Sequence, residues 1–414
     1  MSKPQNILII ATVWPEPNSS AAGSRILQLI ELFQSQNWKI TFASAASDSE
    51  HAFDVQTLGI EKVTIELNNK SFDEFISKLQ PSIVIFDRFM IEEQFGWRVA
   101  ENCPDAIRIL DTIDLHCLRQ ARHAALKEKR TFIQADLFSD TAKREMASVL
   151  RCDSSLIISD FEMQLLQDYF KIDKALLHYV PFLLDAITEK ETVLWPSYEQ
   201  RAHFITIGNF IHEPNWNAVQ FLKEEIWPLI RKELPQAELH VYGAYATQKV
   251  NELHNAKEGF LIKGRTVDAM EVVKNAKICL APLRFGAGIK GKLVEAMQCG
   301  TPSVTTVIGA EGMHGESGWN GAIANSPQGI TEAAIKLYSD KIEWEQAQKN
   351  GIAIINNFYS KKIHGEKFLK QIAFLKNNLK LLRQNNFIGA MLMHHTLAST
   401  KYMAKWIEEK NKGN

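Results

Sequence analysis

The chain has 414 residues, with 47 Lys and Arg against 48 Asp and Glu, and its formal charge at pH 7 is -1. Hydrophobic residues make up 45% and charged residues 23%, which excludes a disordered chain, a collagen and a disulfide scaffold. The length predicts about two or three domains. The near-neutral charge gives no reason to expect a nucleic-acid partner.

The cysteines and the apolar runs indicate the cellular compartment of the protein. Five widely spaced cysteines, without a CxxC pair, are typical of a reducing compartment and predict no thiolate metal site. No stretch of about 18 apolar residues occurs, so no transmembrane helix is expected. The N-terminal run NILIIATVW is short and followed by prolines, and we interpret it as a first strand rather than a signal peptide. These features predict a cytoplasmic protein.

In the first half of the chain, apolar runs alternate with amphipathic stretches. Helices are expected near Ser24–Gln36, over the long span 115–150 and near Glu162–Phe170. The expected strands are Asn6–Ala11, Trp38–Ala43, Pro81–Asp87, Ala106–Thr112 and Ser155–Asp160. This order predicts an α/β domain with a mostly parallel sheet.

The pattern breaks around Ile187–Ser197 and then restarts. A helix over Asn217–Leu234 contains Pro228, which predicts a kink or a split. Further strands are expected at His203–Ile207, Glu238–Tyr242, Phe260–Ile262, Ile278–Leu283 and Ser303–Val307. We therefore divide the chain into two Rossmann-like domains, residues 1–190 and 191–345, followed by a helical segment, 346–414. Loops at the carboxyl ends of the two sheets would form a cleft for a nucleotide.

The segment Ile278–Met313 carries the strongest chemical signal. Gly286 and Gly288 allow a ligand to approach the backbone closely, and the helix that follows directs free N–H groups at the same loop. Lys290 and Lys292 add positive charge, which together predicts a diphosphate site. Glu295, one turn into the helix, suits the two hydroxyl groups of a ribose.

The same segment contains a GxGxxG pattern that admits another interpretation. Its glycines are Gly286, Gly288 and Gly291, and Glu311 follows at the spacing of a dinucleotide-binding fingerprint. That fingerprint normally follows the first strand of its domain, whereas this one follows a late strand. A nicotinamide or flavin site is therefore the less favoured alternative.

The sequence GAGIKGKLVEAMQCGTPSVTTVIGAEGM resembles the donor-site segment of GT-B glycosyltransferases, of the large retaining group 1 type known as family 4. FITIGNFIHEPNWNAVQFLKEEIWP resembles the opening of their C-terminal domain. The resemblance is clear over residues 201–312 and weaker before 190. It implies a GT-B fold, an N-terminal acceptor-side domain, a C-terminal nucleotide-sugar donor domain and terminal helices that cross back to the N-terminal domain.

The resemblance assigns roles within the donor segment. Glu295 matches the second Glu of the family's E-x7-E motif, which implies ribose binding. The first Glu falls at Ala287, so the identity of the sugar, and activity itself, is in question. That Glu usually touches hydroxyls of the donor sugar.

The restart of the second domain departs from the family at another position. The family's Gly-Arg is Gly208-Asn209 here, so the Arg that would face the leaving diphosphate is missing. Lys290 and Lys292 could supply that charge, with Arg265 as a further candidate. Two departures accompanied by new lysines indicate a rearranged site.

In the N-terminal domain, the resemblance points to a histidine and a loop. His116, in DTIDLHCLR, resembles a family histidine near the donor sugar; the alternative is a helix opening with Asp114 as the N-cap. The loop WPEPNSSAAGSR resembles the acceptor-side loop. Gly23, Ser24 and Arg25 would lie beside the acceptor, unless this loop is an ordinary flexible surface loop.

The resemblance implies transfer of a sugar, with retention of configuration, from a UDP- or GDP-linked donor to a glycan, lipid-linked or other cell-envelope acceptor. His116 and Lys290 would be the catalytic residues. No Asp-x-Asp occurs, and we expect neither a metal site nor a cofactor. The alternatives are a GT-B sugar epimerase or phosphorylase, and a non-catalytic binding protein of the same fold.

The C-terminal segment is basic. Residues 361–414 hold eleven Lys and Arg against three Glu. The favoured interpretation is a solvated helix packed across both domains. The alternative is peripheral contact with anionic lipid on the inner face of the membrane.

Overall fold

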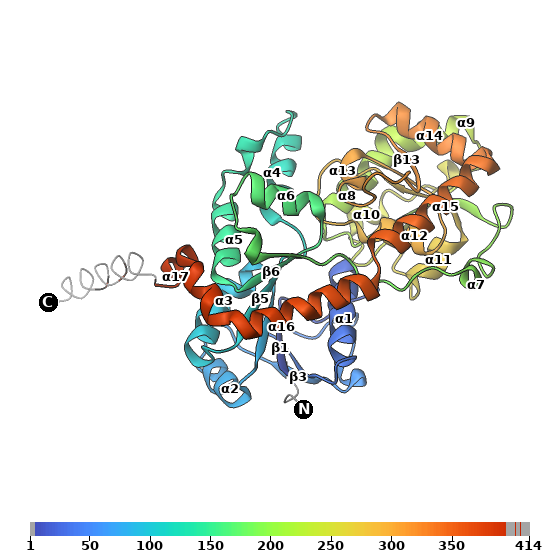
Figure 1. Ribbon diagram of the computed structural model, residues 1–414. Coiled ribbons are helices and arrows are strands. Elements are labelled where there is room, and N and C mark those ends of the chain that lie inside the picture. Colours follow the sequence, from blue (N-terminus) through green and yellow to red (C-terminus); the bar gives the residue numbers. More distant parts are fainter. Residues whose placement is uncertain (1–4, 395–401, 403–405, 407–414) are drawn as a thin grey trace.

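The computed structural model describes residues 5–394, 402 and 406 and contains two parallel sheets (Figure 1). The first sheet has seven strands in the order β3-β2-β1-β4-β5-β6-β7. Its strands are β1 (Asn6–Ala11), β2 (Lys39–Ser44), β3 (Glu61–Thr64), β4 (Ile83–Asp87), β5 (Ile107–Asp111), β6 (Ser154–Ile157) and β7 (Leu177–Tyr179). Strands β1 and β4 pair in register, Ile7 with Ile83 and Ile9 with Ile85, and both are buried.

The second sheet repeats the same winding with six strands in the order β10-β9-β8-β11-β12-β13. Its strands are β8 (Ala202–Ile207), β9 (Leu239–Tyr242), β10 (Phe260–Gly264), β11 (Ala276–Ala281), β12 (Ser303–Thr305) and β13 (Gly321–Ile323). The strand order reverses at β1/β4 in one sheet and at β8/β11 in the other. Such switch points are where open parallel sheets bind ligands.

Helices cover the sheets and connect the domains. They are α1 (Ala21–Gln34), α2 (Ser71–Leu79), α3 (Phe89–Asn102), α4 (His116–Lys127), α5 (Asp140–Arg151), α6 (Asp160–Asp168), α7 (Glu189–Thr192), α8 (Glu213–Phe221), α9 (Trp227–Glu233), α10 (Gln248–Asn251), α11 (Ala269–Asn275), α12 (Gly291–Gln298), α13 (Val307–Ala310), α14 (Pro327–Ser339), α15 (Lys341–Phe358), α16 (Lys361–Asn385) and α17 (Phe387–His394).

The prediction of two Rossmann-like domains followed by helices that cross back is confirmed. Helix α15 belongs to the second domain, and α16 runs from it across the first domain (Figure 1). Phe368, Ile372 and Leu375 of α16 join the same buried cluster as β1 and α1. The boundary at 190 falls between the two sheets, and that at 345 falls inside α15.

Two expected helices differ from the structure. The span 115–150 is not one helix, because α4 ends at Lys127 and Ser139 starts α5 by accepting the N–H of Ala142. The helix over 217–234 contains one π-helical turn, Leu222–Ile226, immediately before α9. Pro228 follows that turn, and the wider turn accommodates a residue that has no N–H to donate.

Candidate functional site

A cavity of about 410 Å³ lies between the two domains, and loops at the carboxyl ends of both sheets line it. The N-terminal domain contributes residues 17–22, Arg88, Ile113, Asp114, His116 and Arg119. The C-terminal domain contributes, among others, Gly208, Asn209, His212, Asn215, Arg265, Gly286, Ala287, Lys290, Lys292 and Glu295. The structure therefore brings together every residue predicted for the donor side except Gly288, which lies between lining residues of the same loop.

The loop before α12 is pressed against the N-terminal domain. Gly288 has φ +63°, and a Cβ there would lie 2.9 Å from the Cβ of Asp114, so both the conformation and the close approach favour glycine. Its N–H donates to Oε1 of Glu162 at 2.8 Å. One of the amides predicted to face a diphosphate is thus already satisfied by the protein.

Both predicted lysines reach the cavity wall. Lys290 is only 8% exposed, and its Nζ donates to the carbonyl of Gly288 at 2.7 Å. Burial lowers the pKa of Lys290 below its usual range, although the carboxylate of Glu311 opposes this effect. Burial also lowers the pKa of Lys292 to about 8, and the neighbouring Glu295 opposes this effect. An arriving anion would stabilise the charged form of both.

Glu295 and Lys292 lie near one another under the β8 loop. Burial raises the pKa of Glu295, and the charge of Lys292 opposes that rise. A Cβ on Gly208 would lie 2.8 Å from Nζ of Lys292, so the missing side chain leaves room for the ammonium group.

The remaining donor-side candidates, Asn209 and Arg265, also line the cavity. The side chain of Asn209 supports its own loop, because Oδ1 accepts the N–H of Ile211 at 2.8 Å. Arg265 follows β10 and is exposed.

His116 is the first residue of α4 and is 8% exposed. Its ring meets Phe89 edge-on, with centroids 5.4 Å apart, and its Nε2 lies 3.4 Å from Oδ1 of Asp114. Burial lowers the pKa of His116 to about 4, so the ring is neutral at pH 7. A neutral imidazole can both donate and accept a hydrogen bond.

The start of α4 differs from the alternative interpretation of this segment. Leu115, not Asp114, is the N-cap, and its side chain makes no capping bond. Two buried carboxylates satisfy the first turn instead: Glu162 accepts the N–H of Leu115, and Glu145 accepts those of His116 and Cys117.

The predicted acceptor-side residues require a correction. Arg25 is 1% exposed; its Nε lies 3.0 Å from both carboxylate oxygens of Asp111, and one NH group donates to the carbonyl of Val180 at 2.7 Å. Its guanidinium is therefore unavailable to an acceptor. The space at Gly23 is filled by the backbone of Glu16, which a Cβ would approach to 2.5 Å, and Ser24 donates to the carbonyl of Pro17. Residues 17–22, which precede these three in the loop and at the start of α1, line the cavity instead.

Four titratable residues that line the cavity were not predicted as site residues: Arg88, Asp114, Arg119 and His212. Arg88 follows β4 directly and has φ +72°. Asp114 follows Ile113, whose φ of +62° is a strained conformation for a β-branched residue. Burial raises the pKa of Asp114, but Arg119 and the neighbouring histidines outweigh this effect and lower it overall. The only local signal in the sequence is that Arg88 and Asp114 closely follow β4 and β5, and this does not show that they meet Arg119 and His212 across a cavity.

Arg122 of α4 ties the two domains together beside the cavity. It donates to the carbonyl of Gly286 at 2.9 Å and to both carboxylate oxygens of Glu311 at 2.7 and 2.8 Å. Glu311 therefore pairs with an arginine and does not line the cavity. It cannot serve as the ribose-binding acid that a nicotinamide or flavin site would need there. Among the described residues, no three His, Cys, Asp or Glu side chains are grouped so that they could hold a metal ion.

Comparison with known proteins agrees with this architecture. Residues 201–340 match the family model described as Glycosyl transferases group 1. A search of curated proteins gives no match.

Solved structures match over nearly the whole chain at low identity. Sucrose-phosphate synthase from Thermosynechococcus elongatus is 14% identical with a TM-score of 0.65, covering 90% of this chain and 99% of that one. S. aureus TarM, as a mutant in complex with fondaparinux, α-GlcNAc-glycerol and UDP, is 10% identical with a TM-score of 0.66 (89% and 99% coverage). Anabaena Alr3699/HepE in complex with UDP and glucose is 12% identical with a TM-score of 0.67 (90% and 100%). The resemblance to group 1 glycosyltransferases is confirmed over residues 201–340, and the solved structures share the GT-B fold of the whole chain.

Proposed function

We propose that this chain, which has the GT-B fold and matches the group 1 glycosyl transferases over its second domain, moves a sugar from a UDP- or GDP-linked donor to a glycan, lipid-linked or other cell-envelope acceptor, with retention of configuration. The observation that carries the proposal is the cavity between the domains, in which Lys290, Lys292 and Glu295 share one wall. Structures titled as complexes with UDP or UDP-glucose share this fold.

The diphosphate of the donor would lie against the start of α12. Lys290 and Lys292 supply positive charge there, and the first N–H groups of a helix add to it. Positive groups fixed where negative charge develops on the leaving diphosphate lower the barrier more than they would in water. Arg88, Arg119 and Arg265 provide further cations around the same cavity.

Glu295 would accept hydrogen bonds from the ribose hydroxyls. The donor sugar would lie between the two domains, where His116 and Asp114 line the wall opposite α12. A neutral His116 can hydrogen-bond a hydroxyl without competing with the diphosphate for positive charge, and Asp114 offers a carboxylate beside Gly288. Ala287 itself offers no polar side chain.

Retention follows if acceptor and leaving group lie on the same face of the sugar. A departing phosphate oxygen could then take the proton of the acceptor hydroxyl, so the protein's part is positioning and electrostatics. We predict that turnover needs no metal ion. We also place the reaction in the cytoplasm, where the nucleotide sugars would be supplied.

The test has two stages. UDP and GDP are first screened by thermal shift, since a ligand at ~100 times its dissociation constant adds about 2.7 kcal/mol to stability. The protein is then given a panel of sugars linked to the stabilising nucleotide. The UDP or GDP released is measured with and without acceptors. Consumption of donor without acceptor would instead indicate an epimerase.

Two variants assign the roles. Lys290→Ala should lower kcat by ~10²-fold or more through lost charge at the diphosphate. Glu295→Ala should raise the donor KM roughly tenfold or more. Lys249→Ala, exposed on the second domain, is the matched control. Wild-type turnover in the Lys290 variant would contradict the assignment.

One observation favours a non-catalytic binding protein as the second candidate. The N–H of Gly288 and the carbonyl of Gly288 are both engaged within the protein, by Glu162 and Lys290. If that loop is permanently closed on itself, millimolar UDP and GDP will leave the melting temperature unchanged.

A further inference from the structure

The outer faces of α16 and α17 expose large apolar side chains. On α16 these are Ile363, Phe374 and Leu381, which are 49%, 50% and 56% exposed. Their spacings of eleven and seven residues place them on one face of the helix, opposite the buried Phe368, Ile372 and Leu375. On α17, Phe387, Ile388 and Met391 are 70%, 59% and 60% exposed.

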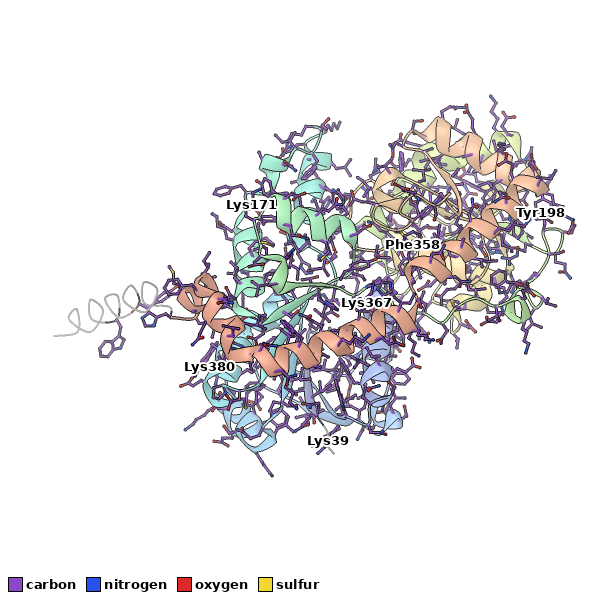
Figure 2. The ribbon with its side chains drawn as sticks, in the orientation of Figure 1. Lys39, Lys171, Tyr198, Phe358, Lys367 and Lys380 are labelled. Carbon is purple, nitrogen blue, oxygen red and sulfur yellow. The ribbon has the colours of Figure 1, made fainter. Side chains whose placement is uncertain are left out.

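The charge on this surface is predominantly positive, and the exposed Glu366 is the one acidic residue between residues 361 and 394. Lys367 and Lys370 lie in the same stripe as Ile363, four and seven residues on. Lys380 and Lys376 are also exposed but lie about 100° and about 140° round the helix from that stripe. Figure 2 labels Lys367 and Lys380, which extend from α16 on the first domain. No Asp or Glu occurs between residues 367 and 394. Within the described part of the chain none of these four lysines has an ion pair, whereas Lys361 pairs with Glu31.

The helices that carry this surface are held firmly by the first domain. Arg383 donates from Nε to Asp153 at 2.7 Å, and Asn386 donates to the carbonyl of Leu150 at 2.7 Å. Gly389 packs so closely on that carbonyl that a Cβ would lie 2.1 Å from its oxygen. The apolar and cationic groups are therefore presented by the folded protein in a fixed arrangement.

We propose that the α16–α17 surface, made of these six apolar side chains and four lysines, docks on a bilayer containing anionic phospholipid. Mixed cationic and apolar side chains on one helical face suit the boundary between headgroups and acyl chains, where the lysines meet phosphates and the apolar groups insert. Aliphatic side chains such as Ile388 and Met391 offer a nucleic acid nothing to stack on. In the described residues no helix is long and apolar enough to cross a membrane, so the contact is a surface contact.

Vesicle flotation of the whole protein tests the proposal. Wild type should float with phosphatidylcholine vesicles that contain phosphatidylglycerol, remain unbound with phosphatidylcholine alone, and detach as salt concentration rises. The variant Lys367→Glu, Lys370→Glu, Lys376→Glu, Lys380→Glu should lower the partition coefficient by about 10²-fold or more. The variant Phe387→Ser, Ile388→Ser should lower it about tenfold, which separates insertion from simple charge attraction.

A matched control makes the same change of net charge elsewhere. Lys232, Lys249, Lys257 and Lys349, exposed on the second domain, are replaced by Glu together; that variant should float nearly as well as wild type. Unchanged thermal midpoints show that the variants are folded. Equal loss in both charge variants, flotation with neutral vesicles alone, or tighter binding of wild type to duplex DNA than to anionic vesicles would overturn the proposal. Because flotation needs no nucleotide, a failure of the proposed glycosyl transfer leaves this result independent.

Discussion

Lys290 and Lys292 are held in the cavity with pKa values below their usual range, that of Lys292 at about 8. A bound diphosphate favours their charged forms and raises these pKa values, so binding takes up protons once the solution pH exceeds about 8. We predict that UDP affinity is steady between about pH 7 and pH 8 and then falls, by up to about tenfold per pH unit for each lysine.

Isothermal titration calorimetry at pH values on both sides of 8 measures this decline. Lys292→Arg, which stays charged throughout, is the control and should remove the part of the decline that Lys292 contributes, leaving the part due to Lys290. An affinity that is constant to pH 9 in wild type would contradict the role of these lysines.

Arg25 gives a prediction of the opposite kind, on stability rather than on binding. Removing one partner of a buried ion pair leaves an uncompensated charge, so Arg25→Ala should lower the free energy of unfolding by about 3–5 kcal/mol at pH 7. Urea unfolding measures the loss, and the double variant Arg25→Met, Asp111→Leu should recover part of it. Full stability with a raised acceptor KM would instead return Arg25 to the acceptor site.

These residues show which members of the candidate site could be predicted from the sequence and which could not. Lys290, Lys292 and Glu295 could be predicted because one short segment contains all three. Arg88 and His212 could not, because they meet only after two sheets have been ordered and joined. Arg25 was misjudged because the periodicity of α1 does not show that its guanidinium turns toward Asp111 of β5.

At the scale of elements, Glu162 of α6 joins α4 to the donor loop. Its Oε1 accepts the N–H groups of both Leu115 and Gly288, while its Oε2 has no partner among the described residues. Burial raises the pKa of Glu162 above its ordinary value of 4.5. The carboxyl group thus stabilises the fold fully below that value, and the contribution is lost as pH rises through its raised pKa.

We therefore predict that Glu162→Gln, which keeps the accepting oxygen but cannot ionise, loses less stability than wild type between about pH 5 and pH 8. Differential scanning calorimetry across this range measures the difference. Glu66→Gln, on an exposed loop, should behave as wild type. Parallel pH profiles for wild type and Glu162→Gln would show that this carboxyl group does not titrate with the fold.

Elements were predictable where their patterns were long and apolar. The strands at 6–11 and 276–281 are buried along almost their whole length and were found. Strands β3, β7 and β13 were missed, because EKVT, LHY and GAI lie at sheet edges, are short and are only partly buried. The π turn before Pro228 was foreseen only as a kink, since sequence does not show how a helix absorbs a missing N–H.

On the scale of the whole molecule, the pair formed by Arg122 and Glu311 holds the two domains at the cavity. We predict that Arg122→Ala lowers the thermal midpoint and raises the donor KM severalfold, because the carbonyl of Gly286 loses its donor. A double-mutant cycle with Glu311→Ala should give a coupling of about 1.5–3 kcal/mol.

The exposed pair Arg130 and Asp136, within one domain, is the matched cycle and should couple far more weakly. Equal coupling in the two cycles would mean that the interdomain pair adds nothing beyond a surface contact. The motif in the second domain could be read from one segment, but this partnership across 189 positions could not.

The crossing of α16 also determines the order in which the two domains can finish folding during synthesis. The face of the first sheet that carries Ile7 and Ile9 packs against Ile30 of α1 and is completed by Phe368, Ile372 and Leu375 of α16. During synthesis that face stays incomplete until α16, which follows every strand of the second domain in the chain, has left the ribosome. The first domain is thus the last to finish folding, although it is the first to be translated.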